Sequence, residues 1–202
     1  MTLRSIILCS LVPVCMSGCL LRSVHPLVTE QSATFAPELL GSWTDMKTLD
    51  SWTFRRSGDR SYRLLYYQRV SKRGTPTESP GDTAVFHAHL GMVGGGQFLD
   101  LQPVEGPNGY TSLKNEFYNL HLFPTHSFLR VRIDSGLLHL AQVDPDWLQT
   151  QIDSGAVSIK HERTGDALLL TASTEELQAL FARLATTSEA YSVEAVLQRS
   201  GP

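Results

Sequence analysis

The segment that decides the fold reads Leu129-Arg-Val-Arg-Ile-Asp-Ser-Gly-Leu-Leu-His-Leu-Ala-Gln-Val143. In its first half, apolar Leu129, Val131 and Ile133 alternate with charged residues. Successive side chains of a β-strand point to opposite faces, so this alternation predicts a strand with one buried and one solvated face. Asp134-Ser-Gly136 is a turn sequence, and we therefore expect a β-hairpin over residues 129–143.

The same alternation continues on the N-terminal side of this hairpin. Phe86, Ala88 and Leu90 share one face of a further predicted strand, and the three glycines at 94–96 predict a turn into a strand over 98–101. We expect the other strands over residues 41–46, 52–55, 61–69, 157–163 and 167–171, and irregular segments over 71–82 and 103–119.

Two helices are predicted among these strands. Asp144 precedes a proline at the first helical position, which is a favoured helix start, and Gly155 is a suitable end. Ser173 and Glu176 have the spacing of a capping box, and apolar residues follow at offsets of three, four and seven. The sequence thus predicts one α+β domain, mainly antiparallel β, over residues 38–202, with two short helices in its C-terminal half.

The composition limits the classes of partner. The chain has 202 residues and a formal net charge of −3, from 17 Lys and Arg against 20 Asp and Glu. Nucleic-acid binding requires a concentrated positive surface, so we expect no nucleic-acid partner. All three cysteines lie within the first 19 residues. After removal of a leader, the chain would therefore have neither a disulfide nor a cysteine-ligated metal.

The N-terminus has the three parts of a secretory signal: Arg4, an apolar run from Ile6 to Val14, and small residues before Cys19. The run is too short to be a good membrane-spanning helix. Met16-Ser-Gly-Cys19 resembles the lipobox of bacterial lipoproteins. This resemblance implies that residues 1–18 are a removed leader and that Cys19 carries the fatty acyl chains, whose buried methylenes would anchor the protein to a membrane.

The residue after the cysteine helps to sort lipoproteins in cells with two membranes, where Asp usually retains them at the inner membrane. Here the residue is Leu20, so the resemblance implies a protein anchored to the outer membrane and facing the periplasm. Residues 19–37 contain prolines and show no sustained period, and we interpret them as a tether between the anchor and the domain.

Gly41-Ser-Trp43 resembles the Gly-x-Trp opening of lipocalin-like β-barrels. Together with the segment from Leu170 to Leu177, it also resembles a group of functionally uncharacterised bacterial lipoproteins. The first resemblance implies a lipocalin-like fold, either a partly closed barrel or a strongly curved sheet. We interpret Trp43 as a core residue rather than a ligand contact, because large aromatic side chains dominate core packing.

His87 and His89 are the candidate metal ligands. Positions i and i+2 of a strand share one face, so both imidazoles could approach one zinc ion. A third ligand would come from among His121, His126, His139 and His161, but their spacing selects none of them. The alternative is that His87 and His89 are ordinary residues of a solvated strand face.

Other templates for a site are absent or have a structural explanation. The sequence lacks a Gly-x-Ser-x-Gly nucleophile elbow and the Lys of a phosphate-binding loop. Arg130 and Arg132, with Asp134, form either a ligand-contacting face or a solvated strand face, and we favour the second.

We therefore expect a non-enzymatic lipoprotein of the bacterial envelope that binds or scaffolds an envelope protein or a small molecule, and no cofactor. A carrier of a small apolar ligand is one alternative. A metal-dependent hydrolase that uses His87 and His89 is the other. A roomy apolar cavity inside the barrel would favour the carrier, whereas an interior filled by side chains would favour a protein that acts through its surface.

Overall fold

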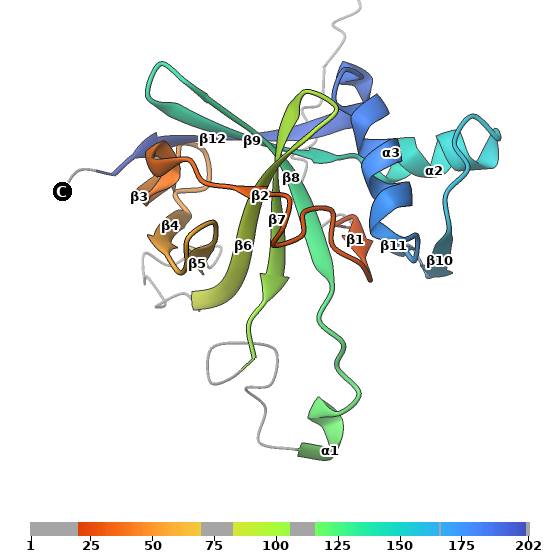
Figure 1. The fold of residues 1–202 in the computed structure, drawn as a ribbon, viewed down its shortest axis with the longest axis horizontal. Helices are drawn as coiled ribbons and strands as arrows, with labels where there is room; N and C mark the ends of the chain where they lie inside the picture. Colours follow the sequence, from red (N-terminus) through yellow and green to blue (C-terminus); the bar gives the residue numbers. More distant parts are fainter. Residues whose placement is uncertain (1–19, 70–82, 106–115, 166, 201–202) are drawn as a thin grey trace, which may run out of the picture.

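A closed barrel of eight antiparallel strands is the centre of the computed structural model, which describes residues 20–69, 83–105, 116–165 and 167–200 (Figure 1). In order around the barrel, the strands are β3 (Gly41–Asp45), β4 (Ser51–Arg56), β5 (Tyr62–Tyr67), β6 (Thr83–Val93), β7 (Gly96–Pro103), β8 (His126–Asp134), β9 (Leu137–Val143) and β12 (Tyr191–Arg199). Strand β12 closes the ring because it pairs with β9 on one side and with β3 on the other. The predicted antiparallel, lipocalin-like fold is confirmed, and the barrel is fully rather than partly closed.

The barrel interior is filled by its own side chains. Alternate residues of each strand point inward, as the sequence pattern predicted, and they form one continuous apolar cluster. Its buried members are Leu39, Trp43, Phe54, Tyr62, Leu64, Ala88, Leu90, Leu99, Leu101, Leu129, Val131, Leu138, Leu140 and Leu197. The interpretation of Trp43 as a core residue is therefore confirmed.

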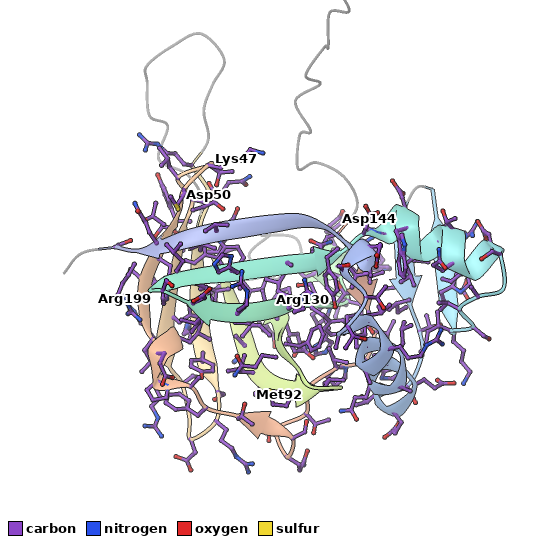
Figure 2. All side chains as sticks on the ribbon, turned by 90° about the horizontal axis from the view of Figure 1, so that it is seen from above. Lys47, Asp50, Met92, Arg130, Asp144 and Arg199 are labelled. Carbon is purple, nitrogen blue, oxygen red and sulfur yellow. The ribbon has the colours of Figure 1, made fainter. Side chains whose placement is uncertain are left out.

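One end of the barrel is covered by contacts between the two ends of the domain. The guanidinium of Arg199 lies over the ring of Trp43, 4.3 Å from its centroid. It also donates hydrogen bonds to the carbonyl oxygens of Glu38 and Leu40. Figure 2 shows Arg199 on the side of the molecule opposite helices α2 (Pro145–Asp153) and α3 (Thr174–Leu184).

A second layer packs on the outside of the barrel. Strands β10 (His161–Thr164) and β11 (Ala167–Leu170) form the predicted hairpin, and β1 (Arg22–Ser23) lies between β11 and the start of β8. Helix α3 covers the outer face of β7 and β8, where its Phe181 ring meets the rings of Phe98 and Phe128 edge to face. These contacts give the protein a second apolar core outside the barrel wall.

The helix starts are those that the sequence predicted. The carboxylate of Asp144 accepts hydrogen bonds from the first backbone N–H groups of α2. At the start of α3, Ser173 and Glu176 form both bonds of the capping box. The remaining helices are short: α1 (Glu116–Asn119), and the 3-10 turns η1 (Pro37–Leu39) and η2 (Ser188–Ala190).

The N-terminal segment differs from the sequence interpretation. Residues 21–34, which we call the N-terminal strap, lie on the barrel wall instead of forming part of a free tether over 19–37. Leu21 is only 3% exposed, and Leu27 and Val28 are buried. Strand β1 pairs with β8 and β11, and β2 (Ala33–Thr34) pairs with β6. The predicted leader, Cys19, the segment 71–82 and most of the segment 103–119 lie outside the described residues.

Candidate functional site

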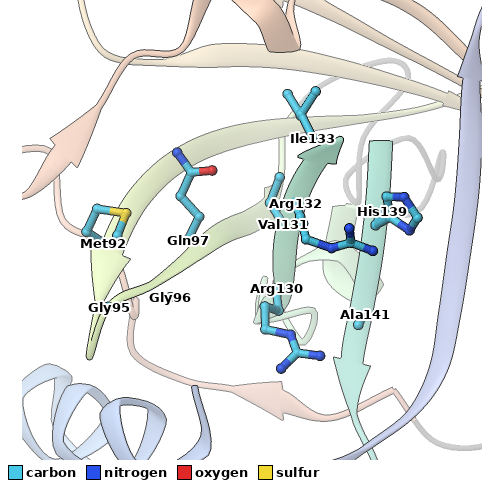
Figure 3. Close-up of a pocket in the computed structure, with 10 residues that line it drawn as sticks. All are labelled: Met92, Gly95, Gly96, Gln97, Arg130, Val131, Arg132, Ile133, His139 and Ala141. Atoms are coloured by element: carbon cyan, nitrogen blue, oxygen red, sulfur yellow. The ribbon is translucent and has the colours of Figure 1, made fainter. Parts of the chain in front are cut away.

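A surface pocket of about 640 Å³ lies at the barrel end that carries the β6–β7 and β8–β9 turns (Figure 3). Its walls come from the β6–β7 hairpin and from β8 and β9. The lining residues are Met92, Gly95, Gly96, Gln97, Arg130, Val131, Arg132, Ile133, His139 and Ala141. A volume of this size is within the range of sites for small molecules.

The pocket lies where the ladder between β7 and β8 ends. The last pair of their ladder is Gln97 and Val131, whereas β8 continues to Asp134 and pairs there with β9 alone. The β6–β7 turn lies directly on α3: a Cβ atom built on Gly94 would be 2.3 Å from the Cα of Ala182. Because the β6–β7 hairpin ends here, β7 has no residues to pair with the last residues of β8, and a gap remains beside them.

Basic side chains form the polar wall of the pocket. In Figure 3, Arg130 and Arg132 leave β8 on the side of β9, and Arg132 lies toward the ring of His139. The strand register places Arg132 and His139 directly opposite one another. The Nη1 group of Arg132 donates to Oδ2 of Asp134 at 2.9 Å, so part of its charge is compensated on the protein.

Arg130 is held in a different way. Its guanidinium lies 3.7 Å from the centroid of the Tyr191 ring, at the start of β12. Burial raises the pKa of the Tyr191 hydroxyl to about 12, and the nearby Arg130 charge opposes this shift. The hydroxyl is buried and has no hydrogen-bond partner among the described residues. The neutral ring thus supports Arg130 by a cation–π contact without taking up its hydrogen-bond donors.

The two histidines singled out from the sequence share the outer face of β6, as expected for positions i and i+2. His87 is exposed and His89 is half-buried. Burial lowers the pKa of His89, and the carboxylate of Asp100, its partner in the β6–β7 register, opposes this shift. Asp100 is itself engaged, because its Oδ1 is 2.7 Å from Nδ1 of His126.

The other predicted metal ligands are dispersed. His121 and His161 each contact a backbone carbonyl oxygen near them in the chain, and His139 lies in the pocket described above. In the part of the chain that the structure describes, no group of three or more His, Cys, Asp or Glu side chains could hold a metal ion. The geometry therefore brings no third ligand to His87 and His89 within these residues.

The sequence analysis favoured a solvated strand face for Arg130 and Arg132. Arg132 is indeed exposed, but Arg130 is half-buried, and both side chains line a pocket that the sequence did not predict. No sequence signal indicates that β7 stops before β8 does. Asp100 was also missed. Its buried carboxylate accepts hydrogen bonds from the backbone N–H groups of Leu27 and Val28 in the N-terminal strap, and nothing local marks an Asp within a strand as an acceptor for a distant segment.

Comparison with protein-family models, with curated proteins and with solved structures gives no match. None of the helices within the described ranges has the length and apolar character needed to cross a bilayer. What the molecule itself defines is therefore a side-chain-filled, lipocalin-like barrel with a basic pocket on its surface.

Proposed function

We propose that the protein is a non-enzymatic lipoprotein of the bacterial cell envelope that binds its partner or ligand through its outer surface. The observation that supports a surface role is the filled barrel interior, where large side chains such as Trp43, Phe54 and Tyr62 occupy the space that an internal ligand would need. The sequence from Met16 to Cys19 supports an anchor of acyl chains on the Cys19 sulfur, and Leu20 supports their insertion into the outer membrane.

The N-terminal strap gives the proposed anchor a geometric consequence. Leu21 is already buried on the barrel, and a fully extended chain spans at most about 3.6 Å per residue. Cys19 therefore lies no more than about 7 Å along the chain from the packed domain. Acyl chains at this position would hold the barrel directly against the membrane surface, without the stand-off that a long tether allows.

The filled interior weighs against a carrier of a small apolar ligand. The metal-dependent hydrolase has no supporting geometry either, since His87 and His89 have no third ligand in the described residues. We retain the surface-acting lipoprotein as the function that the residues support best.

Labelled palmitate tests the anchor in a bacterial host with two membranes. We expect the label on the wild-type chain and on Cys15→Ala, whose cysteine lies within the leader, but not on Cys19→Ala. The labelled protein should be found in the outer-membrane fraction. Equal labelling of the Cys19→Ala variant, or a mature chain that retains residues 1–18, would contradict the proposal.

Native mass spectrometry of the mature chain tests the surface role. We expect the mass of the polypeptide with its modification alone. A stoichiometric apolar molecule that is released only on unfolding would show that the barrel interior opens, and would favour the carrier instead.

A further inference from the structure

The surface pocket combines basic and apolar walls in one site. Arg130, Arg132 and His139 supply cationic or hydrogen-bond-donating groups, while Met92, Ile133 and Ala141 supply apolar contact. Guanidinium groups present several donors in a planar arrangement that matches the oxygens of a carboxylate or phosphate. A ligand that satisfies both walls carries such an oxyanion on an apolar body.

Arg130 is the group that would bind the oxyanion of such a ligand. Arg132 already pairs with Asp134. Arg130, in contrast, has no carboxylate partner in the part of the chain that the structure describes. Its contact there is with the face of the Tyr191 ring.

The surroundings of Arg130 make it a better anion ligand than a fully exposed arginine. Its side chain is half-buried, so an ion pair with it is screened less by water and salt than one on the open surface. Stacking on Tyr191 also restricts the side chain before any ligand binds, which lowers the entropic cost of recognition.

We propose that this pocket binds a small molecule with a carboxylate or phosphate group, which pairs with Arg130, and with an apolar body that contacts Met92 and Ile133. The inference rests on the proposed function in one respect: it names the ligand class of the surface through which the protein is proposed to act. It requires neither the lipid anchor nor any change in the barrel interior.

Isothermal titration of the mature chain, residues 19–202 with Cys19→Ser to prevent lipidation, tests the proposal. The probes are hexyl phosphate, hexanoate, hexanol and inorganic phosphate. We expect hexyl phosphate or hexanoate to bind, and hexanol not to bind at the same concentrations. Inorganic phosphate tests the apolar wall: we expect it to bind more weakly than hexyl phosphate, whereas equal affinity would identify a free oxyanion as the ligand and would contradict the proposed contact with an apolar body.

Arg130→Met removes the charge but keeps an aliphatic stem over Tyr191. We expect it to weaken binding of the anionic probe about tenfold or more, as the loss of a charged hydrogen bond does. The matched control is Arg55→Met, which removes one exposed arginine of β4, outside the pocket lining. Its affinity should remain that of the wild type.

A second pair of variants protects the test against a folding defect in Arg130→Met. A Cβ atom on Gly95 would meet no heavy atom within 4 Å, although the backbone there has φ +82°. Asp and Asn tolerate this conformation better than most residues. Gly95→Asp adds a negative charge to the pocket rim and should weaken anion binding several-fold in a salt-dependent manner, while Gly95→Asn carries the same backbone strain without the charge.

Four results would overturn the proposal: binding of hexanol as tight as that of the anionic probes, binding of inorganic phosphate as tight as that of hexyl phosphate, unchanged affinity in both Arg130→Met and Gly95→Asp, or no binding of any probe up to about 10 mM. Each would leave the palmitate and fractionation results untouched. Conversely, absence of palmitate at Cys19 would remove the proposed anchor without affecting the titrations, so the two failures are distinguishable.

Discussion

Replacing Asp100 by alanine should release the N-terminal strap from the barrel wall. Asp100 lies on the outer face of β7 and is only 2% exposed. Its Oδ2 accepts hydrogen bonds from the backbone N–H groups of Leu27 at 2.7 Å and Val28 at 3.0 Å, while Oδ1 contacts His126. One buried carboxylate therefore joins two segments that are more than 70 residues apart in the sequence.

The expected loss follows from the groups that Asp100→Ala leaves unpaired. A buried donor without a partner costs about 1–3 kcal/mol, so two buried N–H groups cost about 2–6 kcal/mol. This is a large part of the roughly 5–15 kcal/mol by which domains are stable. Two further hydrogen bonds, from Thr174 and Gln178 of α3 to the carbonyl oxygens of Pro26 and Leu27, remain in the variant. The strap thus keeps only part of its attachment, and we expect it to open locally before the whole domain unfolds.

Urea unfolding and amide hydrogen exchange measure the two parts of this effect. The free energy of unfolding should fall by about 2–6 kcal/mol, and the amides of residues 27 and 28 should lose most of their protection. Asp100→Asn keeps an acceptor oxygen and should show a smaller loss. Asp45→Ala is the matched control, because Asp45 also accepts two backbone N–H groups, those of Lys47 and Thr48, but within a local turn. A loss below about 1 kcal/mol in Asp100→Ala, with unchanged exchange at 27 and 28, would refute the reasoning.

Three further predictions concern the turn, the helix cap and the half-buried histidine. Gly94→Ala should destabilise the domain by several kcal/mol, because its Cβ would overlap the backbone of Ala182 and φ is +59° there; a melting temperature within about 2 °C of the wild type would contradict this. Ser173→Ala should cost about 1 kcal/mol in urea unfolding, since it removes one half of the capping box with Glu176 and leaves the start of α3 without its cap. His89 has a pKa lowered from 6.5 by burial, so the unfolded chain takes up a proton at a higher pH than the folded chain. Its contribution to stability is complete above pH 6.5 and declines as the pH falls below that value, and unfolding curves of His89→Gln between about pH 5 and 8 should show a weaker pH dependence than the wild type.

The local features of the fold could be predicted from the sequence. The hairpin of β8 and β9 was identified from alternation and a turn sequence, and the turn has positive φ at Ser135 and Gly136. Both helix caps were identified from short motifs with fixed spacing. In each case the signal and the structure lie within a few residues of one another, so pattern and geometry correspond directly.

Two elements that depend on distant contacts were not predicted. Strand β12 was not recognised, although it closes the barrel by pairing with β3 and β9. The pairing of β12 with β9 shifts register between Tyr191 and Val193, so the start of the strand does not follow the simple alternation on which strand prediction relies. The N-terminal strap was interpreted as a tether because its prolines and lack of period suggest an extended linker. Its backbone is instead satisfied by Asp100 and by α3, and neither partner leaves a mark in the strap's own sequence.

The surface pocket shows why alternation alone cannot distinguish a solvated strand face from a binding site. Arg130 and Arg132 would occupy the outward positions of β8 whether that face were solvated or formed a binding site, so the sequence of β8 cannot separate the two. What changes their role is the path of the neighbouring hairpin. The β6–β7 turn lies so close to α3 that only a glycine fits at position 94. Strand β7 begins at Gly96, directly after this turn, so its ladder with β8 ends at the pair of Gln97 and Val131 while β8 continues to Asp134. The pocket thus lies beside the end of a hairpin whose turn is packed on α3, and a change at the contact between Gly94 and α3 should alter a site that neither of them lines.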